Sequence, residues 1–212
     1  MVGLFARSLE ASRKIKGLLV IVAALYTLSF TVGWLMISLQ LPFAIEFRKG
    51  ILEIVATQRP FTSVFELVKS GSLVSAILLT FAVNLTIGAF ASTTLPGAVP
   101  LLGALGIVAV TISRGVMIGL TYPEVMILSF PTFLVAVGTM ILELGAYVFS
   151  GAAGINIALA SVFPRRYQVD SRWKAFKEAW RDAAGIFVIV AILLVLGAVW
   201  EMAGLFLLIH ST

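Results

Sequence analysis

Residues 141–154 read Ile-Leu-Glu-Leu-Gly-Ala-Tyr-Val-Phe-Ser-Gly-Ala-Ala-Gly and lie inside an almost wholly apolar stretch, residues 130–163. Glu143 is the one charged residue of this stretch. A carboxylate in the middle of a lipid-spanning helix is costly, so it has to face other helices or a wet cavity. The stretch therefore predicts a membrane span in which Glu143 marks a structural or functional centre.

The composition of the whole chain points to the same class of protein. Of 212 residues, 60% are hydrophobic and 12% are charged, and the mean hydropathy is +1.10. These values lie far outside the range of soluble domains. Because one crossing needs roughly 20 apolar residues, we predict an all-α membrane helix bundle with about five transmembrane helices in a single domain, residues 1–212.

Apolar runs set the limits of most spans. We predict crossings at residues 17–39, 72–90, 97–120 and 183–209. The uncharged connection 92–96 is short enough to be a tight turn between antiparallel neighbours.

Residues 126–163 are about twice as long as one crossing requires. They could form two spans folded at residues 150–154, or one crossing followed by a broken, partly re-entrant or surface-lying helix. Charge favours the second arrangement. The N-terminal segment and the loop 165–182 are both basic, as cytoplasmic segments usually are. If both are cytoplasmic, an even number of crossings separates them, which four spans satisfy and five do not.

Three segments combine charges with apolar residues at helical spacing and predict helices at the membrane surface: residues 1–13, 43–69 and 170–182. The second is expected to break near Pro60. The third places Trp173, Phe176 and Trp180 on one face and should lie flat on the inner leaflet. The predicted membrane-interface residues are Arg165, Arg166, Arg172, Trp173, Lys174, Lys177, Trp180 and Arg181. Their charge suits contact with anionic lipids and not binding of nucleic acid.

Small residues predict where helices approach closely. The predicted packing residues are Gly115 and Gly119, followed by Ala146, Ser150, Gly151, Gly154 and Ala158. Four members of the second group recur every four positions and share a helix face, which can pack against a neighbouring helix or a copy in an oligomer. Glu143 lies on nearly the same face, so its carboxylate should point into the packed interface and away from lipid.

Arg114 is the natural intramembrane partner for Glu143, because it is the only basic residue inside a predicted span, with Asn84 as a polar neighbour. We expect an ion pair that locks the bundle, in preference to a proton or substrate relay. Glu201 lies within nine residues of His210 and is interpreted as an interfacial residue.

Enzyme classes find little support in the sequence. There is no Cys, and the sole His, His210, is two residues from the last position of the chain. Metalloprotease, serine hydrolase and P-loop motifs are missing. We therefore predict no catalytic, cofactor-binding or metal-binding residues.

Several of these residues together resemble the stage II sporulation protein M (SpoIIM) family of integral membrane proteins. Its members carry Pro-His-Gly-Ile-x-Glu-Leu-Pro-Ala followed by Gly-Ala-Ala-Gly. The matching residues are Asn84, Gly115, Gly119, Ile141, Glu143, Leu144, Ala146 and Gly151 to Gly154. The chain departs from the pattern with Gly-Thr-Met at residues 138–140, with Gly145 in place of the second Pro, and with Arg114 in place of Asn.

The resemblance implies five spans and a non-enzymatic role as a membrane scaffold; in spore formers, members anchor peptidoglycan-degrading partners. Our first hypothesis is therefore a scaffold in the cell membrane, with a cytoplasmic N-terminus, that forms homo-oligomers or binds other membrane proteins, or shapes the bilayer. The alternative is a permease subunit of an ABC-type exporter, in which residues 172–181 dock on a separate ATPase. A third hypothesis is an ion or proton conduit through Glu143.

Overall fold

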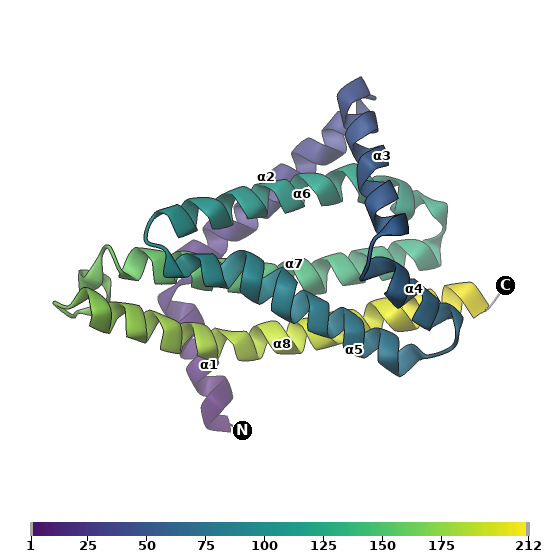
Figure 1. Ribbon diagram of the computed structural model, residues 1–212. Helices are drawn as coiled ribbons and strands as arrows, with labels where there is room; N and C mark the ends of the chain where they lie inside the picture. The colour runs from purple at the N-terminus through teal and green to yellow at the C-terminus, as the bar shows by residue number, and fades with distance from the viewer. Residues whose placement is uncertain (1, 211–212) are drawn as a thin grey trace.

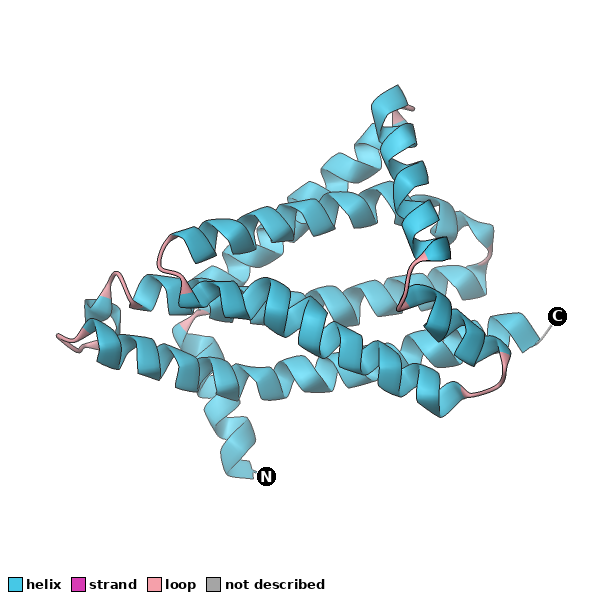
Figure 2. Ribbon diagram, viewed as in Figure 1, coloured by secondary structure: helices cyan, strands magenta, loops and turns pink. Residues whose placement is uncertain are grey.

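The computed structural model describes residues 2–210, which form helices joined by short connections and contain no strand (Figure 2). Met1 of the predicted helix 1–13 and the side chain of Arg166 lie outside the described part. The α-helices are α1 (Val2–Lys14), α2 (Lys16–Ser38), α3 (Pro42–Thr57), α4 (Phe61–Lys69), α5 (Leu73–Val83), α6 (Leu102–Leu128), α7 (Phe130–Ala160) and α8 (Arg172–His210). A π-helix, η1 (Asn84–Thr94), and two 3-10 helices, η2 (Leu95–Ala98) and η3 (Pro164–Tyr167), complete the fold.

Within residues 2–210, five helical segments are long and apolar enough to cross a membrane, which confirms the predicted all-α membrane bundle. They are Lys16–Ser38, Leu73–Ala98, Leu102–Val125, Phe130–Ala160 and Arg172–His210. The second span joins α5, η1 and η2 into one rod, which Figure 1 shows running beside α8.

Two predicted breaks in the chain are wrong. Residues 92–96 are not a turn, because the helix continues through η2 to Ala98 and the turn falls at residues 99–101. For residues 126–163, the single crossing favoured by charge is present, but neither the fold at residues 150–154 nor the break after the crossing is, because α7 is one helix of 31 residues, about 46 Å long. Gly154 is buried against the backbone of the second span and Gly151 against side chains of α2 and α6, and that packing holds a helix that glycine alone would weaken.

The predicted separate helix 170–182 is also wrong as an independent element. Residues 172–182 are the first turns of α8, which continues without a break to His210 over 39 residues, about 58 Å. Charge marks the end of the apolar region but does not stop a helix, and no Pro lies between these limits. Because hydrocarbon is only about 30 Å thick, α8 extends well beyond it.

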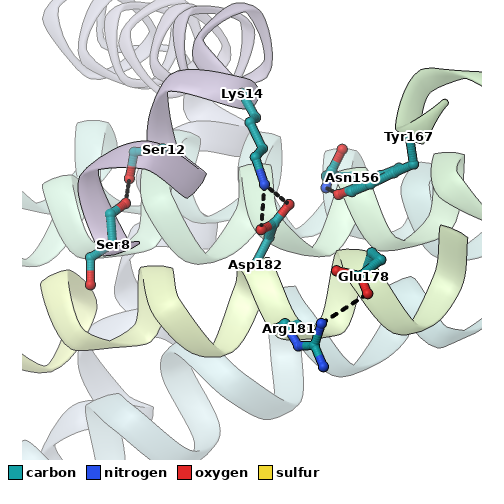
Figure 3. Close-up of polar contacts among 8 residues, drawn as sticks. All are labelled: Ser8, Ser12, Lys14, Asn156, Tyr167, Glu178, Arg181 and Asp182. Carbon is teal, nitrogen blue, oxygen red and sulfur yellow. Dashed lines mark hydrogen bonds and ion pairs between the residues drawn. The ribbon is translucent and has the colours of Figure 1, made fainter. Parts of the chain in front are cut away.

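An ion pair fixes α1 against α8. The Lys14 ammonium lies 3.0 Å and 3.3 Å from the two carboxylate oxygens of Asp182 (Figure 3). The contact places the N-terminal segment and the start of α8 at the same end of the bundle. Four crossings separate them, as the even-number argument from charge predicted.

The two ends of the bundle differ in charge. Ten of the 15 Lys and Arg residues belong to the end with α1 and the α7–α8 connection: Arg7, Arg13, Lys14, Lys16, Arg165, Arg166, Arg172, Lys174, Lys177 and Arg181. We call this end the basic face. Figure 1 shows α3, α4 and the C-terminus of α8 at the opposite end. This end, with the last turns of α6, carries four basic and four acidic residues: Arg48, Lys49, Arg59, Lys69, Glu46, Glu53, Glu66 and Glu124. The predicted break near Pro60 is confirmed, since α3 and α4 meet there.

Glycines set the distance between α2 and α6. A Cβ on Gly119 would clash with the Phe30 carbonyl oxygen, and one on Gly115 would clash with the Ser29 hydroxyl. Gly33 approaches the Val116 carbonyl in the same way from α2. Gly115 and Gly119 therefore allow α6 to pack closely against α2 of the same chain, as predicted.

The small-residue face of α7 packs against the second span. Gly154 lies on the Thr93 carbonyl, and Gly97 lies on the Gly154 carbonyl, too close for a Cβ at either glycine. Ser150 binds Thr93 through their hydroxyl groups, 2.8 Å apart. The other predicted members, Ala146, Gly151 and Ala158, are buried as well. The second span of the same chain covers this face. Of the two predicted uses of the face, packing against a neighbouring helix is therefore the one observed, and not packing against a copy in an oligomer.

Candidate functional site, an acidic cavity inside the bundle

Asn84 of the second span is in contact with Glu143 of α7. The Asn84 amide donates a hydrogen bond of 2.5 Å to one carboxylate oxygen of Glu143. Asn84 is where α5 passes into the π-helical turns of η1, and such turns often mark functional positions. The predicted contact between these two residues is present.

Glu201 joins this site, contrary to its interpretation as an interfacial residue. It lines the same cavity as Glu143 and Asn84. One turn before it on α8, Gly197 packs against Glu143, since a Cβ placed at Gly197 would lie 3.4 Å from Glu143 Cγ. The sequence signal for Glu201 was an acid with apolar residues on both sides, the same signal that identified Glu143.

The cavity has a volume of about 710 Å³, which is within the range of small-molecule sites. Most of its walls are apolar and come from α3, α4 and the last turns of α8, and α4 adds three polar side chains to them, Thr62, Glu66 and Lys69. Representative wall residues are Leu52, Val55, Phe61, Phe65, Val83 and Leu205. The polar floor consists of Thr80, Asn84, Glu143 and Glu201. The amphipathic helices α3 and α4 thus cover a pocket with an acidic floor at the end opposite the basic face.

Helix geometry gives the depth of the floor below the end of the bundle that carries α3 and α4. Asn84 is 11 residues from the start of α5 at Leu73, and Glu201 is nine residues from the end of α8 at His210. At 1.5 Å per residue these positions lie roughly 14–17 Å from the helix ends. Half the thickness of the hydrocarbon is about 15 Å.

The predicted ion pair between Arg114 and Glu143 is wrong. No salt bridge joins them among the described side chains. Instead, the Arg114 guanidinium donates to the Gly88 carbonyl at 3.2 Å and to the Ser92 hydroxyl at 3.0 Å. A backbone carbonyl and a hydroxyl therefore satisfy the cation without a carboxylate.

Tyr147 completes the surroundings of Arg114. The guanidinium carbon lies 4.1 Å from the centroid of the Tyr147 ring, a cation–π contact. Gly88 leaves room for this ring, because a Cβ there would lie 2.7 Å from the Tyr147 hydroxyl. Tyr147 is one turn beyond Glu143 on α7, so Arg114 sits closer to the basic face than the acid does.

A further buried polar contact lies near the basic face and was not predicted. The Asn156 amide, 3% exposed, donates to the Tyr167 hydroxyl at 2.6 Å and ties α7 to η3 (Figure 3). An Asn in a small-residue segment was the available sequence signal. The contact holds the α7–α8 connection against the bundle.

The predicted interface residues gather at the start of α8. Trp173 stacks on Phe176, and Trp180 lies 6.4 Å from the ring of Phe90 in η1. The Lys177 ammonium lies 5.1 Å from the centroid of the Trp173 ring. Arg172 and Lys174 are exposed on the same turns, whereas Arg165 belongs to η3. Arg181 pairs with Glu178 (Figure 3). The aromatic side chains form one face, as predicted.

Comparison with known proteins identifies the family. The model of the family described as SpoIIM, stage II sporulation protein M, matches residues 22–202, most of the chain. No curated protein and no solved structure matches the chain. The match includes every residue of the cavity floor and all five spans in whole or in large part. The chain is a multi-pass integral membrane protein that belongs to the stage II sporulation protein M family.

Proposed function

We propose that the protein is a non-enzymatic membrane scaffold that holds partner proteins at its basic face. The observation that carries this proposal is the rigid extension of α8. The helix continues past the hydrocarbon with Arg172, Lys174 and Lys177 exposed, and the ion pair between Lys14 and Asp182 braces it against α1. Because this charged helix is already held in place, little conformational entropy is lost in ordering it when a partner binds.

The excess of basic residues on this face supports a cytoplasmic location for it and for the N-terminus. The C-terminus of α8 then lies outside, together with α3 and α4. The lack of Cys and the single His near the end of the sequence support a role without catalysis.

Partner capture in intact cells tests the scaffold. Arg172, Lys174 and Lys177 would be changed together to Gln, and partners would be cross-linked, purified with the protein and quantified by mass spectrometry. The control changes Lys49, Arg59 and Lys69 of the opposite end to Gln. We expect the first variant to lose its set of partners and the control to keep it. Equal recovery from both variants, or no enriched partner with the wild-type chain, would contradict the proposal.

The cavity favours a second candidate, a permease subunit that works with a separate ATPase. A pocket with a polar floor inside the membrane is the type of site in which transporters bind substrate. In that case the basic face would bind an ATPase, and the purified complex would hydrolyse ATP. Partners without ATPase activity would support the scaffold instead.

A further inference from the structure

The acidic cavity lacks an internal counter-charge at its floor. Within the described part of the chain, neither Glu143 nor Glu201 forms a salt bridge. Lys69 is the basic residue of the lining, and its ammonium lies over the Phe65 ring of the same helix, 4.5 Å from the centroid. Glu143 and Glu201 of the floor repel each other when both are ionised, and Glu66 adds a third acid to the lining. A cation placed between the two floor carboxylates removes that repulsion.

Thr80 gives independent support for a ligand. It lines the cavity one helical turn before Asn84, so it lies on the same face of the helix. Thr80 is only 8% exposed, and its hydroxyl has no hydrogen-bond partner in the part of the chain that the structure describes. A buried hydroxyl without a partner is unfavourable, and a donor supplied by a ligand would relieve it.

The volume of the cavity limits what can bind. One helical turn with its side chains, about 10 Å wide and 5.4 Å long, fills on the order of 400 Å³, so the space holds fewer than two turns of a partner helix. A transmembrane segment therefore does not fit. A bare ion would leave most of the apolar wall uncovered, whereas a small amphiphile covers it.

We propose that the cavity binds a small amphiphile with a primary ammonium group, whose apolar tail packs under α3 and α4 and whose ammonium lies between Glu143 and Glu201. The ammonium has three donors, enough for both carboxylates and the Thr80 hydroxyl. The ligand enters from the end of the bundle opposite the basic face. This binding site is separate from the partner surface of the proposed scaffold.

Octylammonium is the probe for a binding test on the purified protein in neutral maltoside micelles. Its affinity would be measured by calorimetry and by the shift in unfolding temperature, with 1-octanol and octanoate as matched probes without the positive charge. We expect saturable binding of octylammonium, at least tenfold weaker binding of octanol, and none of octanoate. Equal effects of octylammonium and octanol would overturn the proposal, because they would show partitioning of the tail alone.

Variants locate the site. Glu143→Gln and Glu201→Gln should each weaken octylammonium binding at least tenfold, since each leaves the cation with one carboxylate fewer. Thr80→Val, a near-isosteric change, should weaken it severalfold and keeps the test usable if a Gln variant does not fold. Glu53→Gln, an exposed acid of α3 outside the cavity lining, is the matched control and should bind as the wild type does. Binding that survives all three cavity changes would refute the proposed site.

Discussion

Replacing Gly154 with Ala tests the close contact between α7 and the second span. A Cβ at this position would overlap the carbonyl oxygen of Thr93 and would lie 3.0 Å from Thr94 Cα. Both contacts are with backbone, so no rotamer change relieves them. The two helices have to move apart.

The magnitude follows from three terms. Ala in place of Gly in a helix favours folding by about 0.5–1 kcal/mol. Overpacking a tight contact costs about 1–3 kcal/mol. Separation also strains the hydrogen bonds of Ser150 with Thr93, 2.8 Å, and with Thr94, 3.1 Å, each worth about 1 kcal/mol. We expect a net loss near 2 kcal/mol, which lowers the unfolding temperature of a chain of this size by roughly 4–8 °C.

Thermal unfolding in mild detergent, followed by tryptophan fluorescence, measures the effect. Gly106→Ala is the matched control, because no described atom lies within 4 Å of a Cβ placed there. This control should be as stable as the wild type or more stable. The reasoning is refuted if Gly154→Ala unfolds at the same temperature as Gly106→Ala.

Three other outcomes are expected. A double-mutant cycle of Asn84→Leu and Glu143→Leu should show a coupling of about 0.6–1.7 kcal/mol in unfolding free energy, and purely additive effects would argue against their hydrogen bond. The double variant Ala11→Cys, Gly185→Cys should form a disulfide on mild oxidation, because the two Cβ positions are 3.9 Å apart. The disulfide would be seen as a mobility shift on non-reducing gels, and its absence would show that α1 does not pack against α8. A phosphatase reporter fused after His210 should be active, because this enzyme works only outside the cytoplasm and the proposed orientation places the end of α8 there. An inactive phosphatase fusion, together with fluorescence of a reporter that works only in the cytoplasm, would show the opposite orientation.

The spans and their packing face could be predicted because they depend on local sequence. Hydropathy over a window of some 20 residues identifies a crossing whatever its neighbours are. The recurrence of small residues from Ala146 to Ala158 likewise identifies a helix face by spacing alone. Asn84 was predicted as a neighbour of Glu143 because few polar groups are available inside the membrane.

The partner of Arg114 could not be predicted because it depends on the relative depth of different helices. Opposite charge suggested a pair with Glu143, yet a backbone carbonyl of η1 and the Tyr147 ring satisfy the guanidinium one turn away. The wide turns of a π-helix have no clear sequence signature. Glu201 was misjudged for the related reason that distance along the sequence from His210 was used in place of depth.

Neither the continuity of α8 nor the cavity could be predicted from the sequence. A change from apolar to charged residues near residue 182 marks a change of solvent, while the helix itself ends only where capping or breaking residues end it. The cavity arises where α3 and α4 cover the ends of α5 and α8, and that arrangement is tertiary.

We expect the cavity to reach mid-membrane from the end of the bundle that carries α3 and α4. Because the chain has no Cys, a single Val83→Cys in the cavity wall can be probed with a water-soluble, membrane-impermeant thiol reagent, with the fully buried Val190→Cys as control. The account predicts that Val83→Cys in intact cells reacts with reagent added outside and that Val190→Cys does not. A Val83→Cys thiol as unreactive as that of Val190→Cys, or one modified only from the cytoplasmic side of inverted vesicles, would contradict it.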